Sequence, residues 1–368
     1  MNLFDKCYSY TRAEEVKSAG IYPYFNPIGE SEGPVVTMGG NKVIMAGSNN
    51  YLGLTQHPRV QEAAKAALKQ YGTSCSGSRY LTGTIDLHIS LEQKLADFMG
   101  EEACLLYSTG YQTGQGVIST LVGRNEALFS DKDNHASIVA GAMISGDRGG
   151  KVVRYKHNDM ADLRRRLERT EVSGGKLIAT DGVFSTFGNI VDLPELVKLA
   201  KEFDCRIMVD DAHAFGVIGE GGKGTASKFG LCDEVDMTVC TFSKTLASLG
   251  GFVVGKERVI NYLKHHSNAL IFSASPTPPS VAAAQAALEV LIDHPELVEK
   301  LNYNSNRIRT GLTEIGFEIM PGETAIVPVP IGDDQTAMQM WKMLFDAGVF
   351  VNVFIPPAVP TGKSMLRT

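Results

Sequence analysis

Arg206-Ile207-Met208-Val209-Asp210-Asp211-Ala212-His213 is a short apolar run that ends in two acidic residues and a histidine. Apolar runs without charged interruptions are typical of strands that are buried on both faces of a sheet. The residues before this run, 193–203, have the periodicity of a helix. A helix followed by such a strand predicts one unit of an α/β domain.

The same pattern recurs on both sides of this stretch. Helical segments, of which 87–99 is the clearest, alternate with apolar runs between about residues 85 and 260. The further runs are Ala103–Tyr107, Ala127–Phe129, Lys151–Tyr155, Lys176–Ala179, Met237–Cys240 and Gly251–Val254. This alternation predicts a doubly wound α/β domain with a mostly parallel sheet. In such sheets ligands bind at the carboxyl ends of the strands, so the polar residues there are candidates for a site.

The pattern changes at Pro276-Thr277-Pro278-Pro279. After it come a long helical segment at 281–315 with a break at His294-Pro295, strand-like residues 325–331, helix-like residues 336–347 and strand-like residues 349–355. These elements predict a smaller α+β domain. Glycine and proline turns before Ser48 predict an arm with a short hairpin. We therefore expect an N-terminal arm at 1–47, a large domain at 48–270 and a small domain at 271–368.

Composition limits the class of protein. The chain has 368 residues, 43% of them hydrophobic, which is enough for two domains that share a cleft. Its formal net charge of −6 argues against bulk nucleic-acid binding. No apolar run is long enough to span a bilayer, and residues 1–12 do not read as a signal peptide, so we expect a cytoplasmic protein. Peripheral membrane contact stays open. The six cysteines show neither C-x-x-C pairs nor zinc-finger spacing, so we expect no disulfide and no metal.

Lys244 is the first candidate for chemistry. It follows an apolar run and is flanked by the hydroxyl residues Thr241, Ser243 and Thr245. A lysine held at a sheet edge can form a Schiff base. Most lysines in loops are surface residues, so this hypothesis depends on the residues that accompany it.

Asp210 and His213 support the hypothesis. An acid at the end of a buried strand can hold a pyridinium nitrogen protonated, which makes pyridoxal phosphate (PLP) an electron sink. His213 can reach the phenolic oxygen of the same ring. The alternative is that Asp210 caps the next helix. The chain between Asp210 and Lys244 is long enough for a crossover to a nearby strand end.

Two further strand ends carry candidate ligands for the same cofactor. The stretch Ser108–Gly114 begins a helix with glycines, and free N–H groups at such a helix start bind phosphate. A strand–glycine–helix junction is a weak signal by itself, because tight turns also need glycine. A neutral His135 could stack on a flat ring, although a lone histidine is more often structural.

The whole pattern resembles the α-oxoamine synthases, a branch of the fold-type I PLP enzymes. The matching segments follow the order of that family and are Ser48–Leu54, Gly77–Thr84, Ser108–Tyr111, His135–Ser137, Asp181–Ser185, Asp210–His213, Thr241–Lys244, Phe272–Ser275, Pro356–Pro360 and Leu366–Arg367. Within the family, the Gly-Ser-Arg and Thr-Phe-Ser-Lys variants are most similar to the bacterial serine palmitoyltransferase branch.

The resemblance implies a role for each candidate. Lys244 would carry PLP and act as the base at the substrate Cα, while Asp210, His213 and His135 would contact the ring. Phosphate contacts would come from Gly110, Tyr111, Thr241 and Ser243, and Ser185 would lie near the ring oxygen. Ser273 and Ser275 would reach the phosphate of a neighbouring subunit, which implies a homodimer with shared active sites. Asn50 and Arg367 would bind the amino-acid carboxylate, for which a bidentate arginine is well suited.

The resemblance also has departures. Asp181 stands where family members usually have glutamate, and Asn189 stands where many have aspartate. Family chains continue beyond the arginine that matches Arg367, so we expect the small domain to be truncated at Thr368.

The expected reaction is the condensation of L-serine with a long-chain acyl-CoA, palmitoyl-CoA, to give ketosphinganine, CoA and carbon dioxide, the first step of sphingolipid synthesis. The alternatives are another substrate pair of the same family, which are alanine with a pimeloyl thioester, glycine with acetyl-CoA or glycine with succinyl-CoA. A fold-type I aminotransferase and a non-catalytic subunit are further alternatives. Because Lys244 is present, the sequence favours an enzyme.

Overall fold

The structure is a computed structural model that describes residues 2–368. These residues form two compact units. The larger unit comprises residues 49–306 and 322–325, and the smaller unit comprises the described residues up to Ser48 together with 307–321 and 326–368. The division falls within the long helix α13 (Glu296–Glu314).

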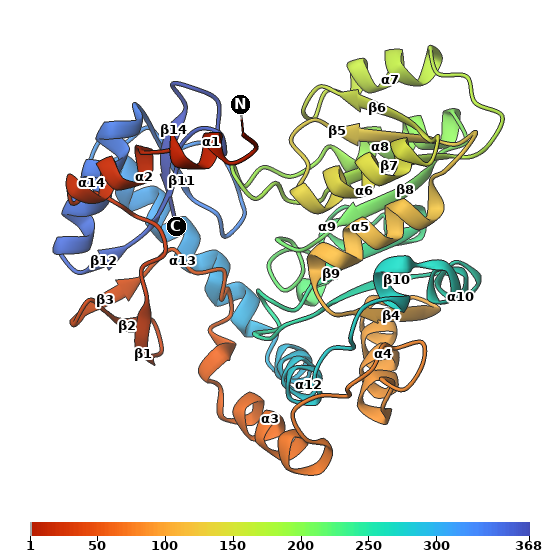
Figure 1. Ribbon diagram of the computed structural model, residues 1–368, viewed down its shortest axis with the longest axis horizontal. Coiled ribbons are helices and arrows are strands. Elements are labelled where there is room, and N and C mark those ends of the chain that lie inside the picture. The colour runs from red at the N-terminus through yellow and green to blue at the C-terminus, as the bar shows by residue number, and fades with distance from the viewer. Residues whose placement is uncertain (1) are drawn as a thin grey trace. The chain divides into compact units, whose positions relative to one another are not determined.

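A seven-stranded sheet forms the centre of the larger unit (Figure 1). Its strands, in spatial order, are β4 (Ala103–Tyr107), β10 (Gly251–Gly255), β9 (Met237–Thr241), β8 (Arg206–Asp210), β7 (Lys176–Asp181), β5 (Ala127–Asp131) and β6 (Lys151–Tyr155). All seven apolar runs identified in the sequence form strands of this sheet. β10 is antiparallel to both of its neighbours, and the remaining pairs are parallel. The predicted α/β fold with a mostly parallel sheet is therefore confirmed.

Helices cover both faces of this sheet, because successive residues of each strand point to opposite faces. In β8, Met208 packs on the face that carries α5 (Gly110–Leu121), α6 (Ala136–Asp147), α10 (Glu257–His266) and α11 (Asn268–Ile271). Ile207 and Val209 pack on the other face, with α7 (Met160–Glu168), α8 (Leu193–Glu202) and α9 (Thr225–Phe229). Further along that second face, α4 (Asp86–Met99) and α12 (Pro278–Asp293) pack on β4, β10 and β9, as does the preceding α3 (Pro58–Tyr71). The doubly wound arrangement follows from this alternation.

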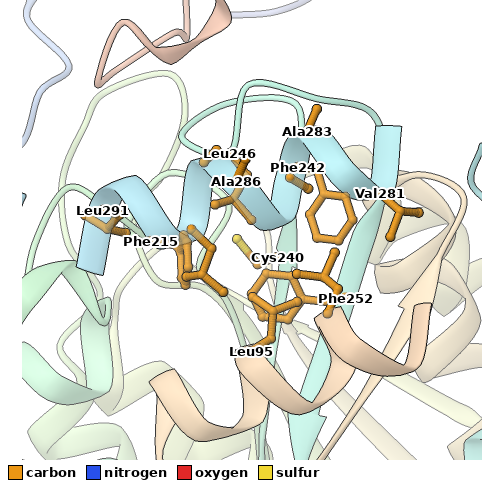
Figure 2. Packing of buried hydrophobic residues seen from close by; sticks show 14 of the residues in the cluster. Leu95, Phe215, Cys240, Phe242, Leu246, Phe252, Val281, Ala283, Ala286 and Leu291 are labelled. Carbon is orange, nitrogen blue, oxygen red and sulfur yellow. The ribbon is translucent and has the colours of Figure 1, made fainter. Parts of the chain in front are cut away.

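The packing of α12 explains where the larger unit ends. Figure 2 shows α12, with Val281, Ala286 and Leu291 labelled, passing over a group of aromatic side chains that includes Phe215 and Phe252. Alanines allow a helix to approach its neighbours closely, and burying each phenylalanine side chain contributes roughly 1.5–3 kcal/mol. Residues 271–306, which the sequence places in the small domain, are for this reason grouped with the sheet in the structure.

His88 joins α4 to the segment that precedes α12. Its Nδ1 accepts a hydrogen bond from the Ile85 N–H at 3.1 Å, and its Nε2 lies 3.1 Å from the Pro276 carbonyl oxygen. Both contacts are satisfied by a neutral ring with its proton on Nε2. Burial is the main cause that lowers the pKa of His88 to about 4, and the nearby Arg79 charge adds to this effect.

This buried histidine predicts a loss of stability in mild acid. The unfolded chain takes up a proton at His88 near pH 6.5, whereas the folded chain resists protonation until about pH 4. The contribution is therefore complete above about pH 6.5 and is lost as the pH falls towards 4, by up to about 3 kcal/mol. Urea unfolding at pH 7 and pH 4.5 should show a smaller pH difference for His88→Gln than for the wild type. His266→Gln, at an exposed position of α10, is the control, and an unchanged difference in His88→Gln would contradict the prediction.

The smaller unit contains two short sheets. In the first, β1 (Ile28–Glu32), β2 (Val35–Met38), β3 (Asn41–Met45) and β12 (Val349–Phe350) lie in that order. The second has the order β11 (Pro328–Gly332), β14 (Ser364–Arg367) and β13 (Asn352–Phe354). α14 (Asp334–Asp346) packs on a core that includes Trp341 and Leu366. The chain before β1 forms α1 (Asp5–Tyr8) and α2 (Arg12–Ser18).

One expected strand of this unit is divided. The sequence predicts a single strand-like segment at 349–355, but β12 pairs with β3 and β13 pairs with β14. The two pieces therefore belong to different sheets, with the buried Val351 between them. Among residues 2–368, no helix is both long enough and apolar enough to cross a membrane.

Candidate active site

The carboxyl ends of six strands, β4 to β9, meet at one edge of the large sheet. β5, β7, β8 and β9 are parallel, and Gly251 at the start of β10 lies opposite both Thr241 of β9 and Tyr107 of β4. β4 therefore ends at the same edge as β9. The sequence candidates that directly end or follow these strands are Gly110, Tyr111, His135, Asp210, His213, Thr241, Ser243 and Lys244.

Lys244 lies in the connection between β9 and β10. The ends of this connection are joined by the Phe242 N–H, which donates to the Gly250 oxygen at 2.9 Å. The hydroxyl of Thr245 donates to the Phe215 oxygen at 2.7 Å, and that of Ser248 donates to the Ser280 oxygen at 2.6 Å. The connection around Lys244 is thus closed at its ends and tied to two other segments, which restricts where its amine can be.

Lys244, Asp210 and His135 interact electrostatically. Burial raises the pKa of Asp210, and the positive charges of Lys244 and then of His135 partly offset this effect. Burial lowers the pKa of His135, while the Asp210 carboxylate acts in the opposite direction. These mutual effects show that an amine, a buried carboxylate and an imidazole lie close enough to influence one another's pKa.

Asp181 is a second carboxylate beside this cluster. It lies directly opposite Asp210 in the parallel pairing of β7 and β8, and its two oxygens accept the His135 N–H at 3.1 and 3.3 Å. Burial, followed by the neighbouring Asp210 charge, raises the pKa of Asp181 well above its ordinary value. His135 is the N-terminal capping residue of α6. Asp181, which stands where family members usually have glutamate, therefore holds the start of this helix.

His213 has a partner that the sequence analysis did not assign. The hydroxyl oxygen of Tyr51 lies 2.6 Å from Nδ1 of His213, and the two ring centroids are 6.0 Å apart. His213 is 8% exposed. Tyr51 is part of the Ser48–Leu54 segment that resembles the family. This resemblance was the only signal in the sequence that could have indicated a role for Tyr51 at the site.

The start of α5 closely approaches the end of β9. A Cβ atom on Gly110 would come within 2.5 Å of the Thr241 Cβ, so only glycine fits there without movement. The Thr241 and Ser243 hydroxyl oxygens are 2.8 Å apart, and the helix is capped by Thr109, whose hydroxyl accepts the Gln112 N–H at 3.1 Å. Backbone N–H groups and hydroxyls thus lie together at a helix start, which is an arrangement that binds phosphate.

Gly110→Ala is expected to disturb this junction. Displacing Thr241 should destabilise the protein by about 1–3 kcal/mol and weaken the binding of a phosphate ligand. Thermal unfolding with and without added PLP measures both effects. Gly123→Ala, at a position where the nearest atom would be 3.8 Å from the new Cβ, is the matched control. Equal behaviour of the two variants would show that the close approach is unimportant.

The remaining candidates have varied surroundings. Gln112 Nε2 donates to the Ser273 hydroxyl at 2.6 Å, and the Ser275 N–H donates to the Gly77 oxygen at 2.9 Å, so both serines lie beside segments of their own chain. Ser185 lies in the turn between Phe184 and Gly188, which is closed by a 2.8 Å hydrogen bond. Tyr111 is 45% exposed, with its ring centroid 6.4 Å from that of His135.

The two predicted carboxylate ligands belong to different units. Asn50 is in the larger unit, where its amide donates to the Thr55 hydroxyl at 2.8 Å. Arg367 is in β14 of the smaller unit, 5% exposed, and its guanidinium lies 5.3 Å from the ring centroid of Phe354. The prediction that both bind one carboxylate therefore continues to rest on the sequence.

Residues 41–368 match the family described as aminotransferase class I and II. The chain belongs to this family. Within the aminotransferase class I and II family, it is 50% identical over 365 residues to a serine palmitoyltransferase of Sphingobacterium spiritivorum, an alignment that covers 99% of this chain and 91% of that protein. It is also 42% identical over 357 residues to an 8-amino-7-oxononanoate synthase of Geobacter metallireducens, which covers 96% and 90% of the two chains.

Solved structures of the family agree with the fold described above. The serine palmitoyltransferase of S. paucimobilis, determined with a bound PLP–myriocin aldimine, has a TM-score of 0.95 and 34% identity, with 100% of this chain and 93% of that chain covered. A serine palmitoyltransferase from Sphingomonas wittichii also has a TM-score of 0.95, with 35% identity and coverage of 100% and 92%. The predicted resemblance to the α-oxoamine synthases and the predicted fold-type I PLP architecture are confirmed.

Proposed function

We propose that this chain is a PLP-dependent acyltransferase that condenses L-serine with a long-chain acyl-CoA and releases CoA and carbon dioxide. The observation that carries the proposal is the cluster of Lys244, Asp210 and His135 at the carboxyl edge of the sheet. Its support from relatives is the 50% identity over 99% of the chain to a protein named serine palmitoyltransferase.

The residues at this edge suit PLP chemically. A buried carboxylate, Asp210, fits a protonated pyridine nitrogen, and the glycine-bearing start of α5 with the Thr241 and Ser243 hydroxyls fits a phosphate. When bound, PLP supplies an electron-withdrawing ring that stabilises negative charge at the amino-acid Cα. Lys244 would hold the cofactor covalently, as lysines do in PLP enzymes.

Each residue of the site then has a defined task. The Lys244 amine would remove the Cα proton of serine and return a proton after carbon dioxide leaves. Asp210 would keep the pyridine nitrogen protonated, while His135 would stack on the ring and His213 would donate to its phenolic oxygen. The phosphate would be held by Gly110, Tyr111, Thr241 and Ser243, with Ser185 near the ring oxygen.

The remaining parts of the proposal rest on the family resemblance. Asn50 and Arg367 would bind the serine carboxylate. Ser273 and Ser275 would contribute to the site of a second copy, which makes the functional protein a homodimer. The reaction would be the first step of sphingolipid synthesis. We propose that the protein acts in the cytoplasm. Because its acyl substrate is a lipid precursor, the proposal is compatible with peripheral contact to a membrane.

A second substrate pair has specific support. Relatives named 8-amino-7-oxononanoate synthase are 40–43% identical to this chain, so alanine with a pimeloyl thioester is the next candidate. The two reactions share their chemistry and differ in the amino acid and the acyl chain, so the catalytic cluster would be the same in both cases.

The visible absorption spectrum of the full chain with PLP tests the proposal. L-serine, glycine, L-alanine and L-threonine would each be added separately to the loaded protein. We expect L-serine to change the cofactor band at the lowest concentration, and palmitoyl-CoA then to yield a long-chain ketone. A stronger response to alanine would support the second substrate pair, whereas the absence of any cofactor band would contradict the proposal.

A further inference from the structure

Tyr51 and His213 form a hydrogen bond between distant parts of the chain. Tyr51 lies in the turn before a short 3-10 helix (Leu54–Gln56), and His213 follows β8 in the same unit. Their contact distance of 2.6 Å, between the phenol oxygen and Nδ1, is at the short end of the range for such bonds. A short bond to a histidine that is 8% exposed is well protected from competition by water.

The chemistry of the two groups decides which of them donates. A neutral phenol is a good donor and a poor acceptor, because its lone pair is delocalised into the ring, whereas an unprotonated imidazole nitrogen is a good acceptor. The favoured arrangement is therefore Tyr51 O–H donating to Nδ1 of His213. In a neutral imidazole only one nitrogen carries a proton, so the proton of His213 then resides on Nε2.

We propose that Tyr51 is a positioning residue that fixes the proton of His213 on Nε2 and so prepares this ring to donate a hydrogen bond from Nε2 to the phenolic oxygen of the cofactor. The second half of this statement rests on the function proposed above. A ring with its proton on Nδ1 would present a lone pair at Nε2 and would repel an anionic oxygen. Tyr51 would thus act on the reaction through His213, without touching the reacting atoms.

Tyr51→Phe removes the hydroxyl and retains the aromatic ring. Its control is Tyr262→Phe, because Tyr262 also contacts a histidine, with its ring centroid 4.1 Å from that of His266. In that pair Nδ1 of the histidine lies 2.9 Å from the Tyr262 backbone oxygen, so the hydroxyl is not the partner. The two variants therefore delete the same group from two tyrosine–histidine pairs, and only one of these pairs uses it.

The first measurement is the tautomer of His213 in the full chain labelled with 15N-histidine, with and without PLP. The chain has eight histidines, and the spectrum of His213→Gln identifies the signal of His213. We expect the wild type and Tyr262→Phe to show Nε2–H, and Tyr51→Phe to show a mixture of tautomers. Nδ1–H in the wild type, or an unchanged tautomer in Tyr51→Phe, would overturn the proposal.

The second measurement is turnover of the loaded enzyme. Loss of a hydrogen bond to a buried ring nitrogen should lower kcat about tenfold in Tyr51→Phe, with each KM changed by less than about twofold. The same substitution in a His213→Gln background should have almost no further effect, because the two residues act as one unit. Equal effects of Tyr51→Phe in both backgrounds would show that the tyrosine acts by another route.

The two measurements separate this inference from the proposed function. If the wild type fails to bind PLP while Tyr51→Phe still alters the tautomer, the proposed cofactor site is wrong and the link from His213 to the cofactor falls with it. If PLP binds and serine is turned over but the tautomer is unaffected by Tyr51→Phe, the proposed function stands and the positioning role of Tyr51 is rejected.

Discussion

Lys244→Ala is expected to lower the turnover of L-serine and palmitoyl-CoA by at least about 10³-fold. Its amine is the member of the cluster with Asp210 and His135 that can both bond to the cofactor and move the Cα proton. Alanine removes both abilities while leaving the connection between β9 and β10 intact, because that connection is held by Phe242, Thr245 and Ser248. Release of CoA, measured with a thiol reagent, gives the rate.

Lys256→Ala is the matched control for this variant. Lys256 lies just after β10 and pairs with Glu102 at 3.1 Å on the surface, so its removal should change stability by less than about 1 kcal/mol and leave turnover unaltered. Full activity in Lys244→Ala would show that another group moves the proton and would refute the assignment of this lysine.

Asp210→Asn is expected to lower turnover by about 10²–10³-fold, which is the scale for losing one buried electrostatic contact to developing charge. The amide has nearly the same shape as the carboxylate and can still accept the Ala212 N–H, which now lies 3.0 Å from Oδ1. It cannot hold a pyridine nitrogen in its protonated form. The cofactor band should persist in this variant while CoA release falls.

Stability provides a separate check on Asp210. Burial raises the pKa of this carboxyl, which means that its charged form is costly in the folded protein without cofactor. Asp210→Asn should therefore unfold at the same or a higher temperature than the wild type when PLP is absent. A lower unfolding temperature would indicate that the loss of turnover comes from damage to the fold.

Much of the fold could be predicted because its signals are local. β8 and its neighbours are buried on both faces, so each reads as an uninterrupted apolar run between helical segments. Two features were not predictable in this way. The direction of β10 depends on the tight connection from β9, and the grouping of α12 with the large sheet depends on contacts with α3 and α4 that no single segment encodes.

The candidate site was predictable to a similar extent. Asp210 ends a strand, Lys244 and His135 follow strands, and the geometry of a parallel sheet brings strand ends together. Tyr51 lies outside this rule, since it reaches His213 from a turn that follows no strand of the large sheet. In the sequence, Asp181 stands out only because family members usually have glutamate at this position. Its contact with the start of α6 could not be predicted without the register between β7 and β8.

The position of β10 also has a consequence for synthesis on the ribosome. β4 pairs in the large sheet only with β10, yet β5 to β9 are all translated between them. At about 5–20 residues per second, the nascent β4 waits on the order of ten seconds for its partner. Gly110, directly after β4, and Thr241, at the end of β9, can meet only when β10 emerges and inserts between these strands. A ribosome-bound chain that stops before Gly255 should therefore be unable to capture the cofactor.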